Sequence, residues 1–213
     1  MKVTIVYDNC AAKPELKTDW GFSCLIEVEK EPLILFDTGA DGNTLLYNME
    51  KLSIDPRSIG KIVLSHGHND HIGGLTAILE INKAAEVYVP GSVMLKLQER
   101  RVVSIRQPTR ITDNVFSTGE LSGIEQSLAV KTKRGLIAIT GCSHPGIGLV
   151  LDTISNHGPI YGIIGGLHHC HEFNLLKDLS LICPCHCTQY KYQIKEKFPK
   201  QHILCGAGLE IEI

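Results

Sequence analysis

Three histidines and one aspartate occur within six consecutive residues of the stretch LSHGHNDHIGG. A neutral imidazole offers a nitrogen lone pair and a carboxylate offers a hard oxygen, and zinc, manganese and iron accept both donors. A single histidine in a turn is more often a polar residue that its neighbours satisfy. Four donor side chains at this spacing instead predict a metal site made by His66, His68, Asp70 and His71.

The stretch joins two predicted elements. Residues 61–65 form an apolar run typical of a buried strand, and residues 72–81 have helical spacing. A loop that leaves the carboxyl end of a strand is held by the scaffold yet open to solvent, which is a common place for ligands. Gly67 removes side-chain bulk between two donors, while Gly73 and Gly74 let the helix start approach the sheet or ligand closely.

Three later segments repeat this layout, in which an apolar run ends in a histidine. They are residues 136–144, 161–168 and 181–186. Each histidine alone would more often be a satisfied polar residue, but three at equivalent positions predict further ligands at the same edge. Asp37 also ends an apolar run, where it either caps a turn or supports the metal-binding histidines from behind.

Many short β-type runs, with a few helical patterns between them, predict sheets covered by helices. The predicted strands are 3–7, 22–29, 33–37, 61–65, 86–89, 127–132, 136–140, 160–164, 179–184 and 201–204. The predicted helices are 43–51, 75–81, 147–156 and 188–197. Residues 91–120 have no clear period and form either a flap or lid near the site or an ordinary surface connection. No repeat or linker divides the chain, so 1–213 is expected to be one domain.

The composition is that of a globular domain, with 213 residues, 43% hydrophobic and 21% charged. A net charge of −2 provides no basic field for nucleic acid or an acidic membrane surface. The chain opens without a leader pattern, and its apolar runs are too short to cross a bilayer. We therefore expect a cytoplasmic protein with reduced thiols and a small-molecule substrate, with no nucleic acid or membrane partner. The sequence is compatible with a monomer or with a homo-oligomer.

The cysteines near the end of the chain allow a competing interpretation. Cys183, Cys185 and Cys187, with His186, could form a separate structural zinc site. In an extended segment alternate side chains share a face, so the three cysteines are expected to point one way and His186 the other. The two-residue gaps typical of zinc knuckles are also missing. Small buried packing cysteines are the favoured alternative.

The sequence Phe-Asp-Thr-Gly at 36–39, His-x-His-x-Asp-His at 66–71 and the histidines at 144 and 186 resemble the metallo-β-lactamase superfamily over nearly the whole chain. This resemblance implies an α+β fold of the αββα type, a four-layer sandwich of two mixed sheets with flanking helices. It also implies two divalent metal ions at one edge, with zinc favoured and manganese or iron as alternatives. The stretches VYDN, GCSH, GGLH and PCHCT resemble a narrower group, the dihydropterin-6-ylmethyl-aminobenzene-ribofuranosyl-phosphate synthase-like hydrolases.

The resemblance also implies which residues bind metal. His66, His68 and His144 would hold one ion, and Asp70, His71 and His186 would hold the second. In many superfamily members an aspartate near a strand end bridges the two ions. The comparable region here offers Gly165, Gly166 and His168 and no aspartate, so His168 is expected to act on substrate.

Two cations at an open edge would polarise substrate oxygens and lower the pKa of bound water toward about 7. Asp70 would orient the nucleophile or carry its proton. The same ions could instead hold a pyrophosphate leaving group during a pterin transfer. Gly165, Gly166 and His168 would then contact phosphate, unless the glycines only permit tight packing. Asp8 and Asn9 are further candidates for substrate contact, or they simply turn the chain.

The sequence thus predicts a binuclear metal-dependent hydrolase or transferase that acts on a phosphorylated or pyrophosphorylated small molecule, with a pterin as a candidate. Two alternatives belong to other classes. A di-iron oxygen or nitric oxide reductase-like protein is disfavoured because the chain lacks a fused flavin domain and a bridging carboxylate. A non-catalytic metal or ligand sensor is disfavoured because the set of metal ligands is complete.

Overall fold

The structure is a computed structural model that describes residues 1–95 and 102–213. The first sheet contains β1 (Lys2–Tyr7), β2 (Ser23–Glu27), β3 (Leu33–Phe36), β4 (Ile59–Val63), β5 (Glu86–Pro90), β6 (Val102–Ile105) and β13 (Glu210–Glu212). The second contains β7 (Thr109–Arg110), β8 (Val115–Ser117), β9 (Leu128–Thr132), β10 (Gly135–Thr140), β11 (Ile160–Gly166) and β12 (Leu181–Cys185). Their orders are β13-β1-β2-β3-β4-β5-β6 and β12-β11-β10-β9-β8-β7.

Both sheets are mixed. Strands β3 to β6 are parallel to one another, as are β10 to β12, and the other neighbours pair antiparallel. The carboxyl ends of parallel strands meet at the same edge of their sheet. The segments that follow β4, β10 and β12 can therefore share one end of the sandwich.

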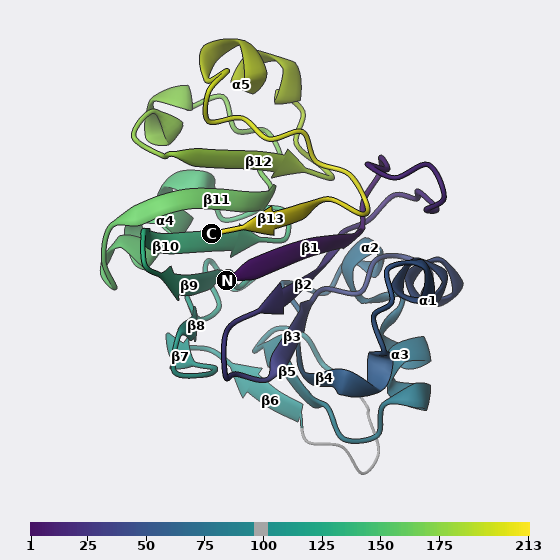
Figure 1. Cartoon of the computed structure of the whole chain (residues 1–213). Helices are drawn as coiled ribbons and strands as arrows, with labels where there is room; N and C mark the ends of the chain where they lie inside the picture. Colours follow the sequence, from purple (N-terminus) through teal and green to yellow (C-terminus); the bar gives the residue numbers. More distant parts are fainter. Residues whose placement is uncertain (96–101) are drawn as a thin grey trace.

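Helices cover the outer face of each sheet (Figure 1). They are α1 (Gly42–Lys51), α2 (Asn69–Ile72), α3 (Leu75–Ile81), α4 (Ile147–Ser155) and α5 (Lys191–Lys197), with 3₁₀ turns at Pro56–Ser58 and Phe173–Leu176. Apolar residues of α1 and α3 pack on the first sheet, and those of α4 and α5 pack on the second. This arrangement confirms the predicted αββα sandwich.

The central strands are apolar along their whole length because both of their faces are buried. In β4, Ile62 packs toward the helices while Val63 packs between the sheets. Leu35 and Phe36 of β3 alternate in the same way. Each fully buried aliphatic side chain contributes about 1.5–3 kcal/mol to stability. The strand ends that carry the donor residues are therefore held by a rigid scaffold.

Several predicted elements need correction. Residues 201–204 are not a strand, because only a single bridge joins His202 to Ile182. The last helix begins at Lys191 and not at 188, because the Thr188 hydroxyl bonds back to the Cys185 carbonyl in a turn. The third histidine of the motif lies inside the short helix α2, and not in an open turn. Strands β6, β7, β8 and β13 were not predicted.

The predicted flap at 91–120 is described only in part, since 96–101 lie outside the described residues. After that gap, the chain forms the edge strand β6 of the first sheet and then β7 and β8 of the second. Most of the described segment therefore connects the two sheets. Among the described residues, no helix combines the length and the apolar character needed to cross a membrane.

Candidate metal centre

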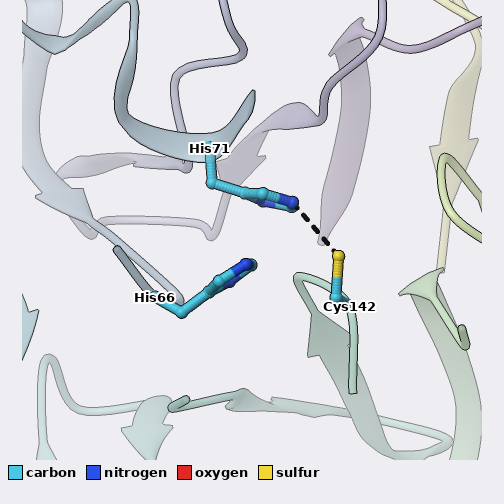
Figure 2. A group of neighbouring side chains, drawn as sticks. All are labelled: His66, His71 and Cys142. Carbon is cyan, nitrogen blue, oxygen red and sulfur yellow. Dashed lines mark hydrogen bonds between the residues drawn. The ribbon is translucent and has the colours of Figure 1, made fainter. Parts of the chain in front are cut away.

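Donor side chains from three segments that follow β4, β10 and β12 converge at one edge of the sandwich. The rings of His66 and His71 lie close together (Figure 2), with centroids 4.2 Å apart and planes inclined at 47°. The His66 ring lies 4.6 Å from that of His144, and the His71 ring lies 5.0 Å from that of His186. The donor atoms form two groups, each within 4.8 Å: His66, His68 and His144, and Asp70, His71 and His186. We call these the first and second triads.

In four of the five histidines a neighbouring side chain fixes the outer ring nitrogen. The Nδ1 atoms of His66, His71, His144 and His186 lie 2.8, 2.7, 2.8 and 2.9 Å from Ser65 Oγ, Asp37 Oδ2, Glu125 Oε2 and Asn9 Oδ1, respectively. His68 instead turns its own Nδ1 toward His66 Nε2, at 3.0 Å. Such anchoring fixes the ring orientation and leaves Nε2 as the donor, as at most histidine metal sites. The donor set therefore fits divalent ions.

Asp37 lies behind the second triad, in the position expected of a supporting residue. Its buried carboxylate contacts His71 Nδ1 and accepts hydrogen bonds from the backbone N–H (2.6 Å) and hydroxyl (2.7 Å) of Ser65. The backbone of Asp37 is left-handed, with φ of 58°. Gly141 is required beside this network, because a Cβ there would lie 2.1 Å from Ser65 Oγ.

His66 and His71 are neutral in the metal-free protein near neutral pH. Burial lowers the pKa of His66 and of His71 to about 3, and burial raises the pKa of Asp37 to about 7. A neutral imidazole keeps the lone pair that a metal ion needs. The site is therefore prepared to accept a cation near neutral pH without releasing protons from these two rings.

Acidification is expected to destabilise the metal-free protein. Between the ordinary histidine pKa of 6.5 and about 3, the unfolded chain binds protons at His66 and His71 that the folded chain does not, so stability falls as pH falls. The pKa of Asp37 shifts in the opposite direction, which offsets the pH-dependence that one of the two histidines contributes and leaves that of the other. Thermal unfolding in the presence of a chelator should show a decreasing Tm from pH 6.5 to pH 4. A constant or rising Tm would contradict neutral, buried rings.

Glu125 is a supporting residue that no motif in the sequence indicated. Its fully buried carboxylate accepts hydrogen bonds from the backbone N–H groups of Cys142, Ser143 and His144, at 2.8, 2.9 and 2.9 Å, and it contacts the His144 ring. Burial alone would raise its pKa, but the hydrogen bonds from His144 and the neighbouring amides outweigh burial and lower the pKa to about 2. A charged Glu125 thus fixes the loop after β10.

Glu125→Gln is expected to weaken metal binding at the first triad by about 10–100-fold, because the variant loses the anionic partner of His144 Nδ1. Glu80→Gln, at an exposed position on α3, is the matched control and should bind like the parent chain. Competition with a chromophoric chelator measures the affinity. Equal affinity in Glu125→Gln and parent would remove Glu125 from the support of the centre.

Asp8 and Asn9, which were predicted to contact substrate or to turn the chain, both contact His186. Asp8 is fully buried and accepts the backbone N–H of His186 at 2.8 Å. Asn9 contacts the His186 ring and donates from Nδ2 to the His186 carbonyl at 3.2 Å. His186 has a left-handed backbone, with φ of 42°, which these contacts stabilise. Both residues therefore position a predicted ligand.

Gly165 and Gly166 also differ from their predicted phosphate role. They end β11 and are buried, and the Gly166 N–H already donates to the Gly141 carbonyl at 3.1 Å. A Cβ at Gly165 would lie 2.0 Å from the Thr140 carbonyl oxygen, and one at Gly166 would lie 2.3 Å from the Gly141 carbonyl oxygen. The geometry therefore supports the alternative prediction, in which the glycine pair permits tight packing.

His168 lies beside the first triad, with its ring centroid 5.1 Å from that of His144. Its buried Nδ1 has no hydrogen-bond partner among the described residues. It lines a pocket of about 220 Å³, which we call the histidine pocket. The lining is Ser143, His144, Gly146, Ile147, Leu167, His168, His169 and Cys170. His168 thus borders both the first triad and this pocket.

A second pocket, of about 400 Å³, is lined in part by His66 and His68. We call it the apolar pocket. Its lining is His66, Gly67, His68, Ile72, Ser92, Val93, Met94, Leu95, Gly123 and Ile124. Both pockets therefore adjoin the first triad, the histidine pocket at His144 and the apolar pocket at His66 and His68.

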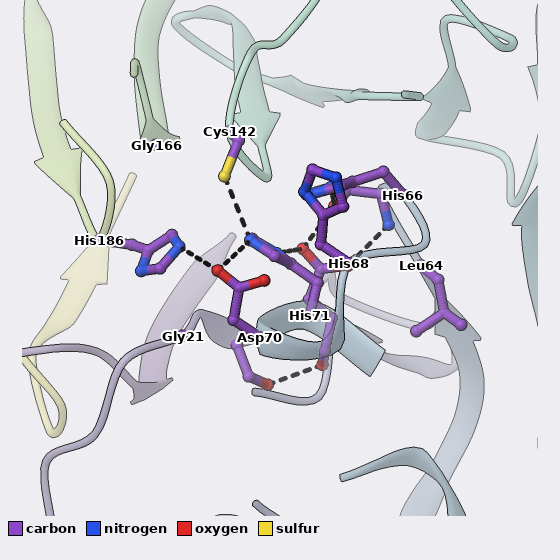
Figure 3. A network of polar contacts seen from close by, with 12 residues as sticks. Gly21, Leu64, His66, His68, Asp70, His71, Cys142, Gly166 and His186 are labelled. Carbon is purple, nitrogen blue, oxygen red and sulfur yellow. Dashed lines mark hydrogen bonds and ion pairs between the residues drawn. The ribbon is translucent and has the colours of Figure 1, made fainter. Parts of the chain in front are cut away.

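Asp70 joins the second triad to Trp20, the only tryptophan in the chain. Asp70 Oδ2 lies 3.2 Å from His186 Nε2 (Figure 3). The same oxygen accepts the indole N–H of Trp20 at 3.0 Å. Burial would raise the pKa of Asp70, but the contacts with His186 and His71 lower it. Asp70 is therefore an anion, and Trp20 can report on its surroundings.

Two of the three cysteines are buried on one shared face, as predicted. Cys183 and Cys185 are fully buried between the sheets, and Cys205 lies with them. Cys187 does not share their face, because β12 ends at Cys185 and the left-handed backbone of His186 redirects the chain. Its sulfur lies near Cys142 instead. All eight cysteines are free.

Comparison with known proteins agrees with this geometry. Residues 21–169 match the model of the metallo-beta-lactamase superfamily. The chain is 30% identical, over 93% of both chains, to the 7,8-dihydropterin-6-methyl-4-(beta-D-ribofuranosyl)-aminobenzene-5'-phosphate synthase of Methanocaldococcus jannaschii. These matches confirm the resemblance drawn from the motifs.

Solved structures give the same fold. Tm1679, a metal-dependent hydrolase of the beta-lactamase superfamily, is 27% identical with a TM-score of 0.76, covering 100% of this chain and 99% of that one. The short form of human tRNase Z is 16% identical with a TM-score of 0.68, at 100% and 99% coverage. At 16% identity, the similarity to tRNase Z concerns the fold alone.

Proposed function

Because this chain belongs to the metallo-β-lactamase superfamily, we propose that it is a binuclear metal-dependent enzyme acting on a phosphorylated or pyrophosphorylated pterin compound. The observation that carries the proposal is the pair of triads, in which neighbouring side chains fix four of the five histidine rings. His66, His68 and His144 would hold one divalent ion and Asp70, His71 and His186 the other, with zinc favoured by the imidazole-rich donor set.

Two bound cations would supply positive charge that stabilises a phosphate or pyrophosphate leaving group. The chain's own residues would do the rest. Asp70, held by Trp20 and His186, is placed to orient a nucleophile or accept its proton. His168 lines the histidine pocket, where its ring would contact the substrate.

The two pockets support a reaction with two substrates. The apolar pocket, with Val93, Met94 and Ile124 in its wall, suits a flat heteroaromatic ring such as a pterin. The histidine pocket is left for the phosphate group, because it adjoins His144 of the first triad and is lined by His168 and His169. The name of the 30%-identical relative joins a dihydropterin to an aminobenzene ribofuranosyl phosphate, which supports transfer over simple hydrolysis.

Turnover assays with the metal-loaded protein test this proposal. We expect pyrophosphate release from a 6-hydroxymethyl-dihydropterin diphosphate to increase when an aromatic amine acceptor is added, and to stop after treatment with a chelator. The control substrates are a phosphomonoester, a phosphodiester and a lactone. Activity on the lactone alone, or none on any substrate, would contradict the proposal, and iron in the purified protein with oxygen reduction would favour the reductase-like alternative.

A further inference from the structure

Cys142 lies between the two triads, although its type and position in the sequence did not mark it as a ligand. Its sulfur is 3.2 Å from His71 Nε2 (Figure 2), and the residue is 3% exposed. The donor atoms of His66, His71 and Cys142 lie within 4.8 Å of one another, and so do those of Cys142, His186 and Cys187. The Cys142 sulfur thus lies close to donor atoms of both triads.

The surrounding backbone is built to put this side chain there. The Cys142 N–H donates to Glu125, which also fixes His144, so one buried carboxylate positions both residues. At the end of the neighbouring strand, a Cβ on Gly166 would lie 3.1 Å from Cys142 Cα and 2.7 Å from Cys187 Sγ. A side chain at Gly166 would therefore clash with Cys142 and Cys187, and glycine at the end of β11 avoids this clash.

From this geometry we infer that Cys142 is a metal ligand, which binds the ion of the second triad as a thiolate. With Asp70, His71 and His186, its sulfur completes four donors, the number that zinc prefers. Binding replaces the S–H bond by a sulfur–metal bond and releases one proton to solvent, so no oxidant is needed. The inference rests on the binuclear centre proposed above.

Substitution with cobalt(II) tests this inference, because a thiolate–cobalt bond produces a charge-transfer absorption band in the near ultraviolet that imidazole and carboxylate donors do not. We expect the band in the parent chain at two equivalents of cobalt. It should disappear in Cys142→Ser, with roughly 100-fold weaker binding of the second equivalent. It should persist in Cys187→Ser and in Cys205→Ser, which control for the other thiols near the centre and between the sheets.

The outcomes separate the two proposals. Two bound cobalt ions without a thiolate band, or a band that survives in Cys142→Ser, would overturn the role of Cys142 and leave the binuclear centre intact. Failure of the parent chain to bind cobalt would overturn both. If Cys142→Ser does not fold, X-ray absorption of the zinc-loaded Cys205→Ser protein decides, since the inference requires a sulfur neighbour at about 2.3 Å from zinc, and a shell of nitrogen and oxygen alone would contradict it.

Discussion

Replacing His68 with alanine is expected to abolish metal-dependent turnover, with a loss of at least about 10³-fold, while the fold stays intact. His68 is exposed, and its ring contacts the rings of His66 and His144. An exposed substitution of this kind usually changes stability by less than about 0.5 kcal/mol. The loss of one of three ligands removes a cation worth several kcal/mol of transition-state stabilisation.

Activity, bound metal per chain and Tm should be measured together for His68→Ala. The matched control is His157→Ala, at an exposed histidine after α4 that belongs to neither triad. The control should keep parent activity and metal content. Parent turnover in His68→Ala would exclude this residue from the mechanism, whereas a large fall in Tm would show that the residue is structural.

Asp70→Asn is expected to have an effect of similar size, with turnover reduced by about 10³-fold or more and the second metal equivalent lost. The substitution keeps the size of the side chain but removes the negative charge that lies near His71 and His186. The Trp20 N–H bonds to this carboxylate, so tryptophan fluorescence reports directly on the site. In the parent chain, we expect fluorescence to change as the second equivalent of zinc is added.

In Asp70→Asn that second change should be absent, while the first equivalent still binds. Asp152→Asn, on the exposed face of α4, serves as the control and should reproduce the parent titration. If Asp70→Asn binds two ions with parent affinity and loses activity only, Asp70 acts on the nucleophile and is not needed as a ligand. If it also keeps parent activity, both of its proposed roles are wrong.

The central strands and the donor motif could be predicted because their signals are local. A strand buried on both faces is a continuous apolar run, as in β3 and β4. The edge strands β6, β7 and β13 and the neighbouring β8 are two to four residues long and carry no such run. These short strands are defined by their pairing with a neighbouring strand, and the periodicity of the sequence does not show that pairing.

The supporting residues were harder to predict because they act across long sequence separations. Glu125 lies 19 residues before His144 in an irregular segment without a motif. Asp8 and Asn9 reach His186 across 178 and 177 positions, because β1 and β12 end near each other in the folded chain. Residue type suggested a polar role for Asp8 and Asn9, but only the packing of the sheets shows which side chain they contact.

The most direct test of the binuclear centre is anomalous X-ray diffraction from crystals of the zinc-loaded protein. We expect two anomalous peaks about 3.5–4 Å apart, one among His66, His68 and His144 and the other among Asp70, His71 and His186. An absence of zinc from both triads, or zinc found only at the buried cluster of Cys183, Cys185 and Cys205, would contradict the account.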